Sequence, residues 1–190
     1  IQHVNFDSKD TQGLVICPTR ELCMQITRDL VTFSNFKQNI NIVPVYGGAS
    51  ISDQIRLIKR GAQIVVATPG RLLDMIERKA IKLKPVQWVV LDEADEMLNM
   101  GFKEDIDSIL EQIPDNRRVW LFSATMPKAV RRIANNYMVN PLEVVVGKQN
   151  SVAVNIDHRY YMMKERDRYH ALKRILDYYP DIFGLIFCRT

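Results

Sequence analysis

The sequence has 190 residues and a mass of 22.0 kDa, which is enough for one complete α/β domain and a further piece of chain. Hydrophobic residues make up 47% and charged residues 25%, as in a folded globular protein, so the composition excludes a disordered chain. The net charge of +4 and the isoelectric point near 9.0 suit an anionic partner without requiring one.

The cysteines argue against a zinc protein and a disulfide-stabilised protein, and the apolar runs argue against a membrane protein. Cys17, Cys23 and Cys188 form no Cys-x-x-Cys pair and have no histidine at ligand spacing, so neither a zinc site nor a disulfide framework is predicted. Free thiols are typical of a reducing compartment. No apolar run approaches the roughly 18 residues that cross a bilayer, and the first residues do not resemble a signal peptide. We therefore expect a cytoplasmic location and no membrane partner.

Six short apolar runs predict the strands of a sheet. The runs are continuous rather than alternating, which is typical of strands covered on both faces, and the helix-like stretches between them favour parallel crossovers. This pattern predicts an α/β fold, a doubly wound parallel sheet with helices on both faces. The six runs are residues 14–17, 42–46, 64–67, 86–91, 119–122 and 142–146.

Two amphipathic stripes predict helices that pack against this sheet. In each stripe the apolar residues recur at spacings of three and four, which places them on one helical face. Both stripes are therefore interpreted as core and not as functional surface. They are Leu22, Ile26, Leu30 and Phe33, and later Ile106, Ile109, Leu110 and Ile113.

The apolar pattern lapses at residues 147–151, where small and polar residues predict a linker. We expect a first domain at 1–147, a linker at 148–155 and the start of a second domain at 156–190. The second segment predicts strands at 156–163 and 185–188 and an amphipathic helix at 169–179. Two strands and one helix bury too little apolar surface to close a core alone, so this segment should be loosely held or propped by another molecule.

Polar and glycine motifs follow five of the predicted strands. In a doubly wound sheet, ligands gather outside the carboxyl ends of the strands, so these motifs should lie at one edge. They are Pro18-Thr19-Arg20-Glu21-Leu22, Gly47-Gly48, Thr68-Pro69-Gly70-Arg71, Asp92-Glu93-Ala94-Asp95 and Ser123-Ala124-Thr125. In kind, order and spacing the motifs resemble those of the DEAD-box family of ATP-dependent RNA helicases.

The resemblance implies a RecA-like first domain, the start of a second similar domain, ATP and Mg²⁺ as cofactors, and RNA as partner. Members of the family carry, before the Pro18 motif, a Gln-containing adenine-recognition motif and a glycine-rich phosphate loop ending in Gly-Lys-Thr. The sequence contains neither. We therefore expect a central fragment of a parent protein of bacterial type, and we expect that the 190 residues alone do not hydrolyse ATP appreciably.

A structural expectation also follows from the resemblance. The phosphate-loop strand of the family lies inside the sheet, so its absence should leave a gap with unpaired backbone groups. Such a fragment is either marginally stable, or its gap is filled by a preceding segment or by another chain.

The resemblance assigns the acidic motif to catalysis. Asp92 is the candidate ligand of Mg²⁺, through water, because magnesium keeps much of its hydration shell. Glu93 is the candidate that positions and deprotonates the attacking water. Asp95 is interpreted as a coupling residue that accepts hydrogen bonds from the hydroxyls of Ser123 or Thr125. Ser123 and Thr125 would link the ATP state to domain closure, although they could also simply begin a helix.

The predicted contacts with RNA depend on helix amino termini, whose unpaired N–H groups and partial positive charge suit a phosphate. Two of the motifs predict such starts, each with a threonine hydroxyl and an arginine, and Gly47-Gly48 would allow a sugar-phosphate backbone to come close. Contacts of this kind position a strand without reading its sequence, so low sequence specificity is expected. Two capped helices and a tight turn are the structural alternative. The predicted contact residues are Pro18, Thr19, Arg20, Glu21, Gly47, Gly48, Thr68, Pro69, Gly70 and Arg71.

The function predicted for the parent protein is ATP-dependent unwinding of short RNA duplexes. One alternative is an RNA-binding or scaffold module that works without ATP. Another is a related helicase or translocase that acts on DNA. Asp95, where relatives often have histidine, favours the RNA group by resemblance. The oligomeric state cannot be predicted from the sequence.

Overall fold

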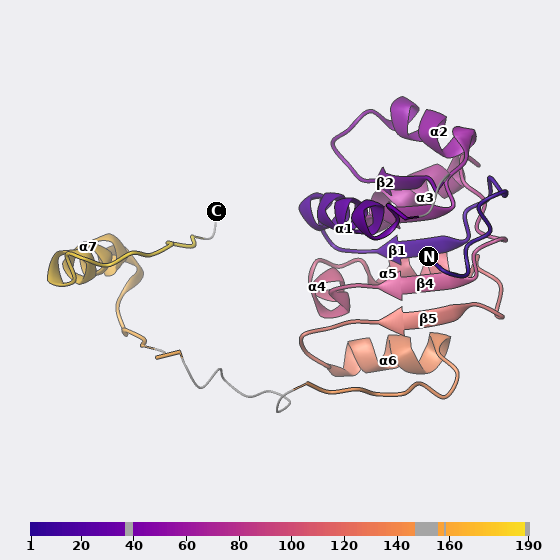
Figure 1. Cartoon of the computed structure of the whole chain (residues 1–190). Helices are drawn as coiled ribbons and strands as arrows, with labels where there is room; N and C mark the ends of the chain where they lie inside the picture. Colours follow the sequence, from indigo (N-terminus) through magenta and orange to yellow (C-terminus); the bar gives the residue numbers. More distant parts are fainter. Residues whose placement is uncertain (37–39, 147–155, 158, 189–190) are drawn as a thin grey trace. The chain divides into compact units, whose positions relative to one another are not determined.

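A computed structural model of the chain describes residues 1–36, 40–146, 156–157 and 159–188 (Figure 1). The chain forms two compact units, Ile1–Gln149 and Asn150–Thr190. All of the described strands belong to the first unit. The linker predicted for residues 148–155 lies outside the described residues.

A five-stranded parallel sheet forms the centre of the first unit, in the order β2-β3-β1-β4-β5. The register places Ile16 of the middle strand beside Ala67 on one side and Leu91 on the other, so the strands end level with one another. The predicted α/β fold with a parallel sheet is confirmed. The strands are β1 Gly13–Ile16, β2 Ile42–Val45, β3 Ile64–Ala67, β4 Trp88–Leu91 and β5 Arg118–Leu121.

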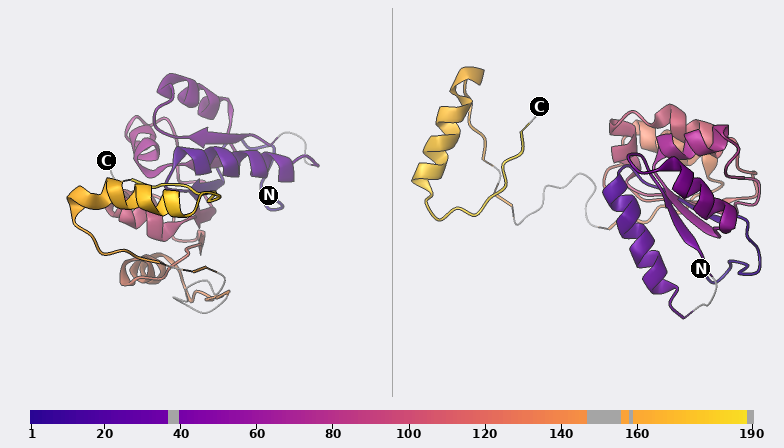
Figure 2. Two further views of the ribbon diagram at one scale, coloured as in Figure 1. Left: turned by 90° about the vertical axis from the view of Figure 1, so that its left-hand side faces the viewer. Right: turned by 90° about the horizontal axis from the view of Figure 1, so that it is seen from above.

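Helices cover the two faces of the sheet unequally (Figure 2). On one face, Leu72 of α3, Ile109 of α5 and Val130 of α6 are buried in a single core with strand residues such as Leu14. On the other face, α1 packs around the buried Val66 of β3. The helices are α1 Arg20–Phe33, α2 Ile51–Arg60, α3 Pro69–Glu77, α4 Ala94–Asn99, α5 Lys103–Leu110 and α6 Lys128–Tyr137, with η1 Glu165–Asp167 and α7 Arg168–Tyr178 in the second unit.

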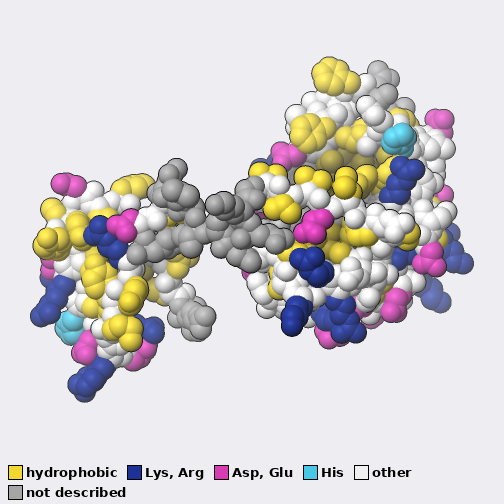
Figure 3. Space-filling model, turned by 90° about the horizontal axis from the view of Figure 1, so that it is seen from below, with side chains coloured by type: hydrophobic (Ala, Val, Ile, Leu, Met, Phe, Trp, Pro, Cys, Tyr) yellow, Lys and Arg dark blue, Asp and Glu magenta, His cyan; other side chains and the backbone are white. Residues whose placement is uncertain are grey.

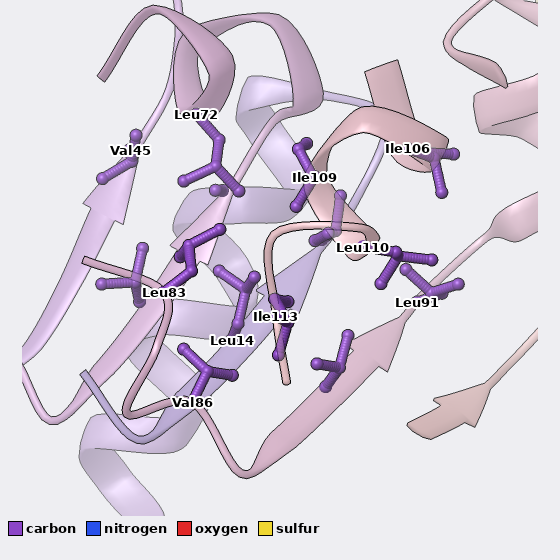
Figure 4. Close-up of a cluster of buried hydrophobic side chains, with 14 of the residues drawn as sticks. Leu14, Val45, Leu72, Leu83, Val86, Leu91, Ile106, Ile109, Leu110 and Ile113 are labelled. Atoms are coloured by element: carbon purple, nitrogen blue, oxygen red, sulfur yellow. The ribbon is translucent and has the colours of Figure 1, made fainter. Parts of the chain in front are cut away.

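The second amphipathic stripe is confirmed, since all four of its residues are buried in the main core (Figure 4). In the first stripe, Leu22, Ile26 and Leu30 pack against the opposite face, but Phe33 is 70% exposed and its predicted place in the core is wrong. Helix α1 has 14 residues and is about 21 Å long, whereas a four-residue strand spans only about 13 Å. The last turn of α1 therefore extends past the sheet.

The sixth predicted strand, residues 142–146, does not form. These residues pair with no described strand, and Leu142 is 87% and Val146 97% exposed. In the second unit, α7 confirms the predicted helix, but the described residues of the segments 156–163 and 185–188 form no strand. A strand needs a neighbour for its N–H and C=O groups, and none of these three segments has one among the described residues.

The sheet remains partly open on the side of α1. Helix α1 packs mainly on β2 and β3, whereas Trp88 of β4 and Trp120 of β5 stack on each other with ring centroids 5.1 Å apart. His3 stacks on Trp88, and Trp120 is 45% exposed. Figure 3 shows hydrophobic side chains gathered on the face seen from the β5 side.

The predicted gap among the strands is wrong, because the five strands are hydrogen-bonded in a continuous order. Strand β5 is an edge strand: among the described residues it pairs with β4 on one side and with no strand on the other. An unpaired edge with exposed aromatic side chains is a surface that a folded protein usually covers.

Candidate functional site

All five sequence motifs lie at one edge of the sheet, which we call the carboxyl edge: the loops that directly follow β1, β2, β3, β4 and β5. The strand ladder continues one residue into several of these loops. The amide of Cys17 donates to the Ala67 carbonyl, that of Asp92 to the Ile16 carbonyl, and that of Phe122 to the Leu91 carbonyl. The loops therefore leave the sheet from fixed starting points, and residues far apart in sequence are brought together as predicted from the strand pattern.

The acidic pair lies where β4 meets α4. Asp92 is half-buried and its Oδ1 accepts a hydrogen bond from the Glu93 amide at 3.0 Å. Glu93 is exposed and occupies the left-handed region with φ of 50°, a conformation that costs a non-glycine residue of the order of 1 kcal/mol or more. This turn ends the strand abruptly and begins α4 at Ala94. The Glu93 side chain is thereby left at the open edge of the sheet.

The acidic pair fits a hydrated divalent cation. Neither Asp92 nor Glu93 forms an ion pair with a described residue, and no hydrogen bond from a described residue is seen to Oδ2 of Asp92. The described residues contain no group of three or more histidine, cysteine, aspartate or glutamate side chains that could enclose a metal. A site with one or two carboxylates and several waters is what Mg²⁺ prefers.

A compact network joins the loops after β4 and β5. The hydroxyl of Thr125 donates to Oδ2 of Asp95 at 2.6 Å, and the Thr125 amide donates to the same oxygen at 2.9 Å. Ser123 takes a different part, because its Oγ accepts from the Asp95 amide at 3.2 Å and donates to the Thr125 carbonyl at 2.7 Å. The amide of Ala94 also donates to the Phe122 carbonyl. These hydrogen bonds tie the two loops directly to each other.

This network changes the titration of Asp95. Partial burial by itself raises the pKa of the Asp95 carboxyl, but the hydrogen bonds from the Thr125 hydroxyl and amide, with the Ser123 hydroxyl close by, outweigh burial and hold its pKa below the usual value. A carboxylate with a depressed pKa stabilises the fold above its ordinary pKa, and this contribution is lost as the pH falls through the lowered value. The Asp95 network should therefore weaken only in acid.

Replacing Thr125 with valine is expected to raise the pKa of Asp95 toward its ordinary value of 3.8, because the variant lacks the hydroxyl that donates to the charged carboxylate. An NMR titration of the Asp95 side-chain carboxyl carbon measures this shift. Thr27→Val is the matched control, since the Thr27 hydroxyl donates to the Cys23 carbonyl instead. An Asp95 titration that is the same in Thr125→Val and in the unmodified chain would contradict the expected role of the hydroxyl.

The loops after β1 and β2 lie next to each other. Thr19 caps α1 by accepting a hydrogen bond from the Leu22 amide at 3.2 Å, and the following Arg20 is largely exposed. Gly48 has φ of +80°, and a Cβ built on it would lie 3.5 Å from Nη1 of Arg20. The predicted threonine cap, arginine and glycine turn are thus brought together on one surface. Glu21 is exposed and pairs with Arg20 at 3.3 Å.

The loop after β3 supports the glycine turn. Arg71 donates from Nη1 to the Ala49 carbonyl at 3.0 Å, so its guanidinium holds the residue after Gly48. Thr68 makes no side-chain cap, and Pro69 occupies the first turn of α3, so the first amides of this helix lack the side-chain acceptor that α1 has. Gly70 is exposed.

Pro18 and Pro69 contribute differently from what a contact residue would. Both are buried, so their side chains help to shape the two helix starts. Arg20, Glu21, Gly47, Gly48 and Gly70 are the predicted contact residues that are exposed.

Sequence reasoning missed Gln54, which fixes the entry to the glycine turn. Its side-chain amide donates to the Tyr46 carbonyl at 3.0 Å and accepts from the Tyr46 amide at 3.3 Å, although Gln54 lies on α2. Gln54 is 6% exposed. The available signal was a polar residue on the apolar stripe of a helix, between Ile51 and Ile58 at spacings of three and four. A buried amide at such a position needs partners, and a neighbouring turn supplies them.

Comparisons with known proteins agree with this geometry. Residues 1–133 match the family model described as DEAD/DEAH box helicase. The chain is 43% identical over 190 residues to the DEAD-box ATP-dependent RNA helicase CshA of Streptococcus pneumoniae and 44% identical to CshA of Bacillus licheniformis. These matches cover the whole chain but only 36% and 39% of the relatives, so the chain spans little more than a third of their length.

A comparison of folds also finds a DEAD box protein. The crystal structure of a DEAD box protein from the hyperthermophile Methanococcus jannaschii matches with a TM-score of 0.72 and 38% sequence identity, over 99% of this chain and 50% of that one. None of the helices in the described part of the chain is long and apolar enough to cross a membrane. The family match covers well over half of the chain, and the relatives align along all of it. The chain belongs to the DEAD/DEAH box helicase family.

Proposed function

We propose that this chain is part of an ATP-dependent RNA helicase and supplies much of its first RecA-like domain. The observation that carries the proposal is the carboxyl edge itself. The Asp92–Glu93 pair, the Asp95 network and the loops around Arg20 and Arg71 all lie at the same edge of one sheet. The relatives that the chain matches are named ATP-dependent RNA helicases.

On the nucleotide side, Asp92 and Glu93 have separate tasks. The Asp92 carboxylate would hold a hydrated Mg²⁺, with Oδ1 kept in place by the Glu93 amide. Glu93 would orient a water molecule and accept its proton on the side-chain carboxylate. ATP, when bound with Mg²⁺, supplies the phosphoryl group to be transferred. The exposed position of Glu93 keeps its carboxylate accessible to that water.

On the RNA side, the contacts would be to phosphates and sugars. The amino end of α3 has amides without a side-chain cap, and Arg20 adds a guanidinium beside the open Gly48 turn. None of these groups reads a base edge, so the proposal includes low sequence specificity. Such contacts do not by themselves distinguish ribose from deoxyribose.

The Asp95 network would couple the two sides. Thr125 and Ser123 follow β5, and their hydrogen bonds reach the same loop that holds Asp92 and Glu93. A change in the position of Glu93 would therefore move the loop after β5. We propose that this link reports the nucleotide state to the rest of the protein, and that the protein works in the cytoplasm.

The test uses a longer parent protein that also carries the phosphate loop. There, Glu93→Gln is expected to lower RNA-stimulated ATP hydrolysis by about 10²–10⁴-fold, because the amide cannot accept the proton of the attacking water. Glu96→Gln, an exposed neighbour on α4, is the matched control and should leave hydrolysis nearly unchanged. The 190 residues alone should show no ATP turnover, with or without either substitution, since they contain no Gly-Lys-Thr phosphate loop.

The alternative, an RNA-binding module that works without ATP, predicts different results. The parent protein would then bind RNA equally with and without ATP, and Glu93→Gln would change nothing. A competition between RNA and DNA of one sequence would separate the RNA helicase from a DNA-directed relative.

A further inference from the structure

A hollow of about 700 Å³ lies away from the carboxyl edge, between the end of α3 and the segment that leads into β4. Three of the side chains that line it are lysines, Lys79, Lys82 and Lys84, and no acidic side chain lines it. Four apolar residues form another part of its wall. Gln112, in the segment after α5, completes the lining. The four apolar residues are Ile76, Ile81, Leu83 and Pro85.

The backbone fixes the positions of the lysines. Lys79 follows α3 in the left-handed region with φ of 55°, and its amide donates to the Ile76 carbonyl at 2.8 Å. The next residues alternate between the interior and solvent: Ile81 and Leu83 are 6% and 5% exposed, whereas Lys82 and Lys84 are exposed. Lys84 lies in a turn that is closed by a hydrogen bond from the Val86 amide to the Leu83 carbonyl at 3.0 Å. Both lysines line the hollow together with Lys79.

The charge of the hollow is not neutralised within the described part of the chain. No ion pair of Lys79, Lys82 or Lys84 occurs there, and Asp74, one turn earlier on α3, already pairs with Arg78. Glu77 is the acidic residue closest in sequence, and it does not line the hollow. Lysines that share a wall and lack partners repel one another, so an acidic ligand would relieve that repulsion.

We propose that this lysine hollow docks an acidic peptide segment of a partner protein that carries an apolar side chain between its carboxylates. The three ammonium groups match carboxylates, and the apolar wall between them gives an anchor side chain a place to be buried. A nucleic acid backbone would match the charges but has no aliphatic or aromatic side chain to place against Ile76 and Pro85. The hollow also lies before β4 in the chain, whereas the proposed RNA loops follow the strands at the other edge of the sheet.

The test measures binding of a short fluorescent peptide, made of glutamates around one central phenylalanine, to the 190-residue chain by fluorescence anisotropy at low salt. The triple variant Lys79→Glu, Lys82→Glu, Lys84→Glu is expected to weaken this binding by about tenfold or more. The matched control reverses the same number of charges elsewhere, with Lys59→Glu, Arg60→Glu and Lys128→Glu, and should retain most of the affinity. A second triple variant, with glutamine at the three hollow positions, covers the case in which charge reversal disturbs the fold, which circular dichroism would reveal.

Two further arms decide the identity of the ligand. A peptide with serine in place of the phenylalanine should bind several-fold more weakly if the apolar wall is used. Equal binding of the two peptides, absence of binding by the phenylalanine peptide, or equal losses in the hollow and control variants would each overturn the proposal. A single-stranded oligouridylate that loses as much affinity as the peptide in the hollow variants would overturn it as well, since the hollow would then be a nucleic-acid contact.

Discussion

Replacing Leu91 with alanine is expected to lower the free energy of unfolding of the first unit by about 2–5 kcal/mol. Leu91 is the last residue of β4, is fully buried and belongs to the main core between the sheet and the helices on that face (Figure 4). Truncation removes apolar contacts and leaves a cavity that a close-packed core fills only in part. Domains are commonly stable by only about 5–15 kcal/mol, so one such change takes a large share. Chemical denaturation followed by tryptophan fluorescence measures the loss.

The matched control for this variant is Leu57→Ala. Leu57 lies on α2 and is 40% exposed, so the same truncation there should cost less than about 1 kcal/mol. Equal losses in the two variants would show that the buried position of Leu91 does not determine its contribution. Because Leu91 directly precedes Asp92, the cavity in Leu91→Ala would also lie beside the acidic pair. The variant is therefore unsuitable as a neutral background for activity measurements.

The parallel sheet could be predicted from the sequence because its strands are short and buried on both faces. Val65 and Val66 of β3 are both fully buried, one toward each face, and a continuous apolar run is the pattern that such burial requires. The same rule fails at residues 142–146. Four of their five residues are apolar. An apolar run becomes a strand only beside another strand, however, and the pattern of a single segment does not show whether that neighbour is present.

The carboxyl edge could be predicted because it depends on strand direction alone. The sequence shows that Thr19, Thr68 and Asp92 each follow an apolar run, and parallel strands bring those positions to one edge. It does not show the contacts that fix the loops. The Arg71 bond to the Ala49 carbonyl and the Gln54 clamp on Tyr46 join residues from different crossovers, and only the packing of α2 and α3 determines which ones meet.

The contacts within the carboxyl edge suggest how its two sides communicate. The Asp92 amide donates to the carbonyl of Ile16, and Ile16 is two residues before Pro18 at the start of the loop that leads to Arg20. The acidic pair and the β1 loop are thus joined through one backbone hydrogen bond between neighbouring strands. A shift of the acidic loop would reach the proposed RNA loops along this bond, in parallel with the Asp95 network.

Replacing Arg20 with alanine is expected to weaken binding of single-stranded RNA to this chain by roughly tenfold at low salt, because the variant loses a guanidinium beside the Gly48 turn. The loss should be the same for oligouridylate and for a mixed sequence, since a phosphate contact carries no sequence information. The slope of log affinity against log salt concentration should also become shallower by about one. Fluorescence anisotropy across a salt series measures all three quantities.

The control for Arg20 is Arg56→Ala, which removes an equal charge from α2, where Arg56 is exposed and paired with Asp53 at 2.8 Å. If the two variants lose affinity equally, the effect belongs to net charge and not to the position of Arg20. A loss in Arg20→Ala that depends on the RNA sequence would mean that the guanidinium reads a base. Arg20→Lys separates the remaining cases: a point charge at this position restores the salt slope, whereas only the planar guanidinium can hold two phosphate oxygens at once. Recovery of the slope without recovery of the affinity would therefore identify a bidentate phosphate contact next to the glycine turn.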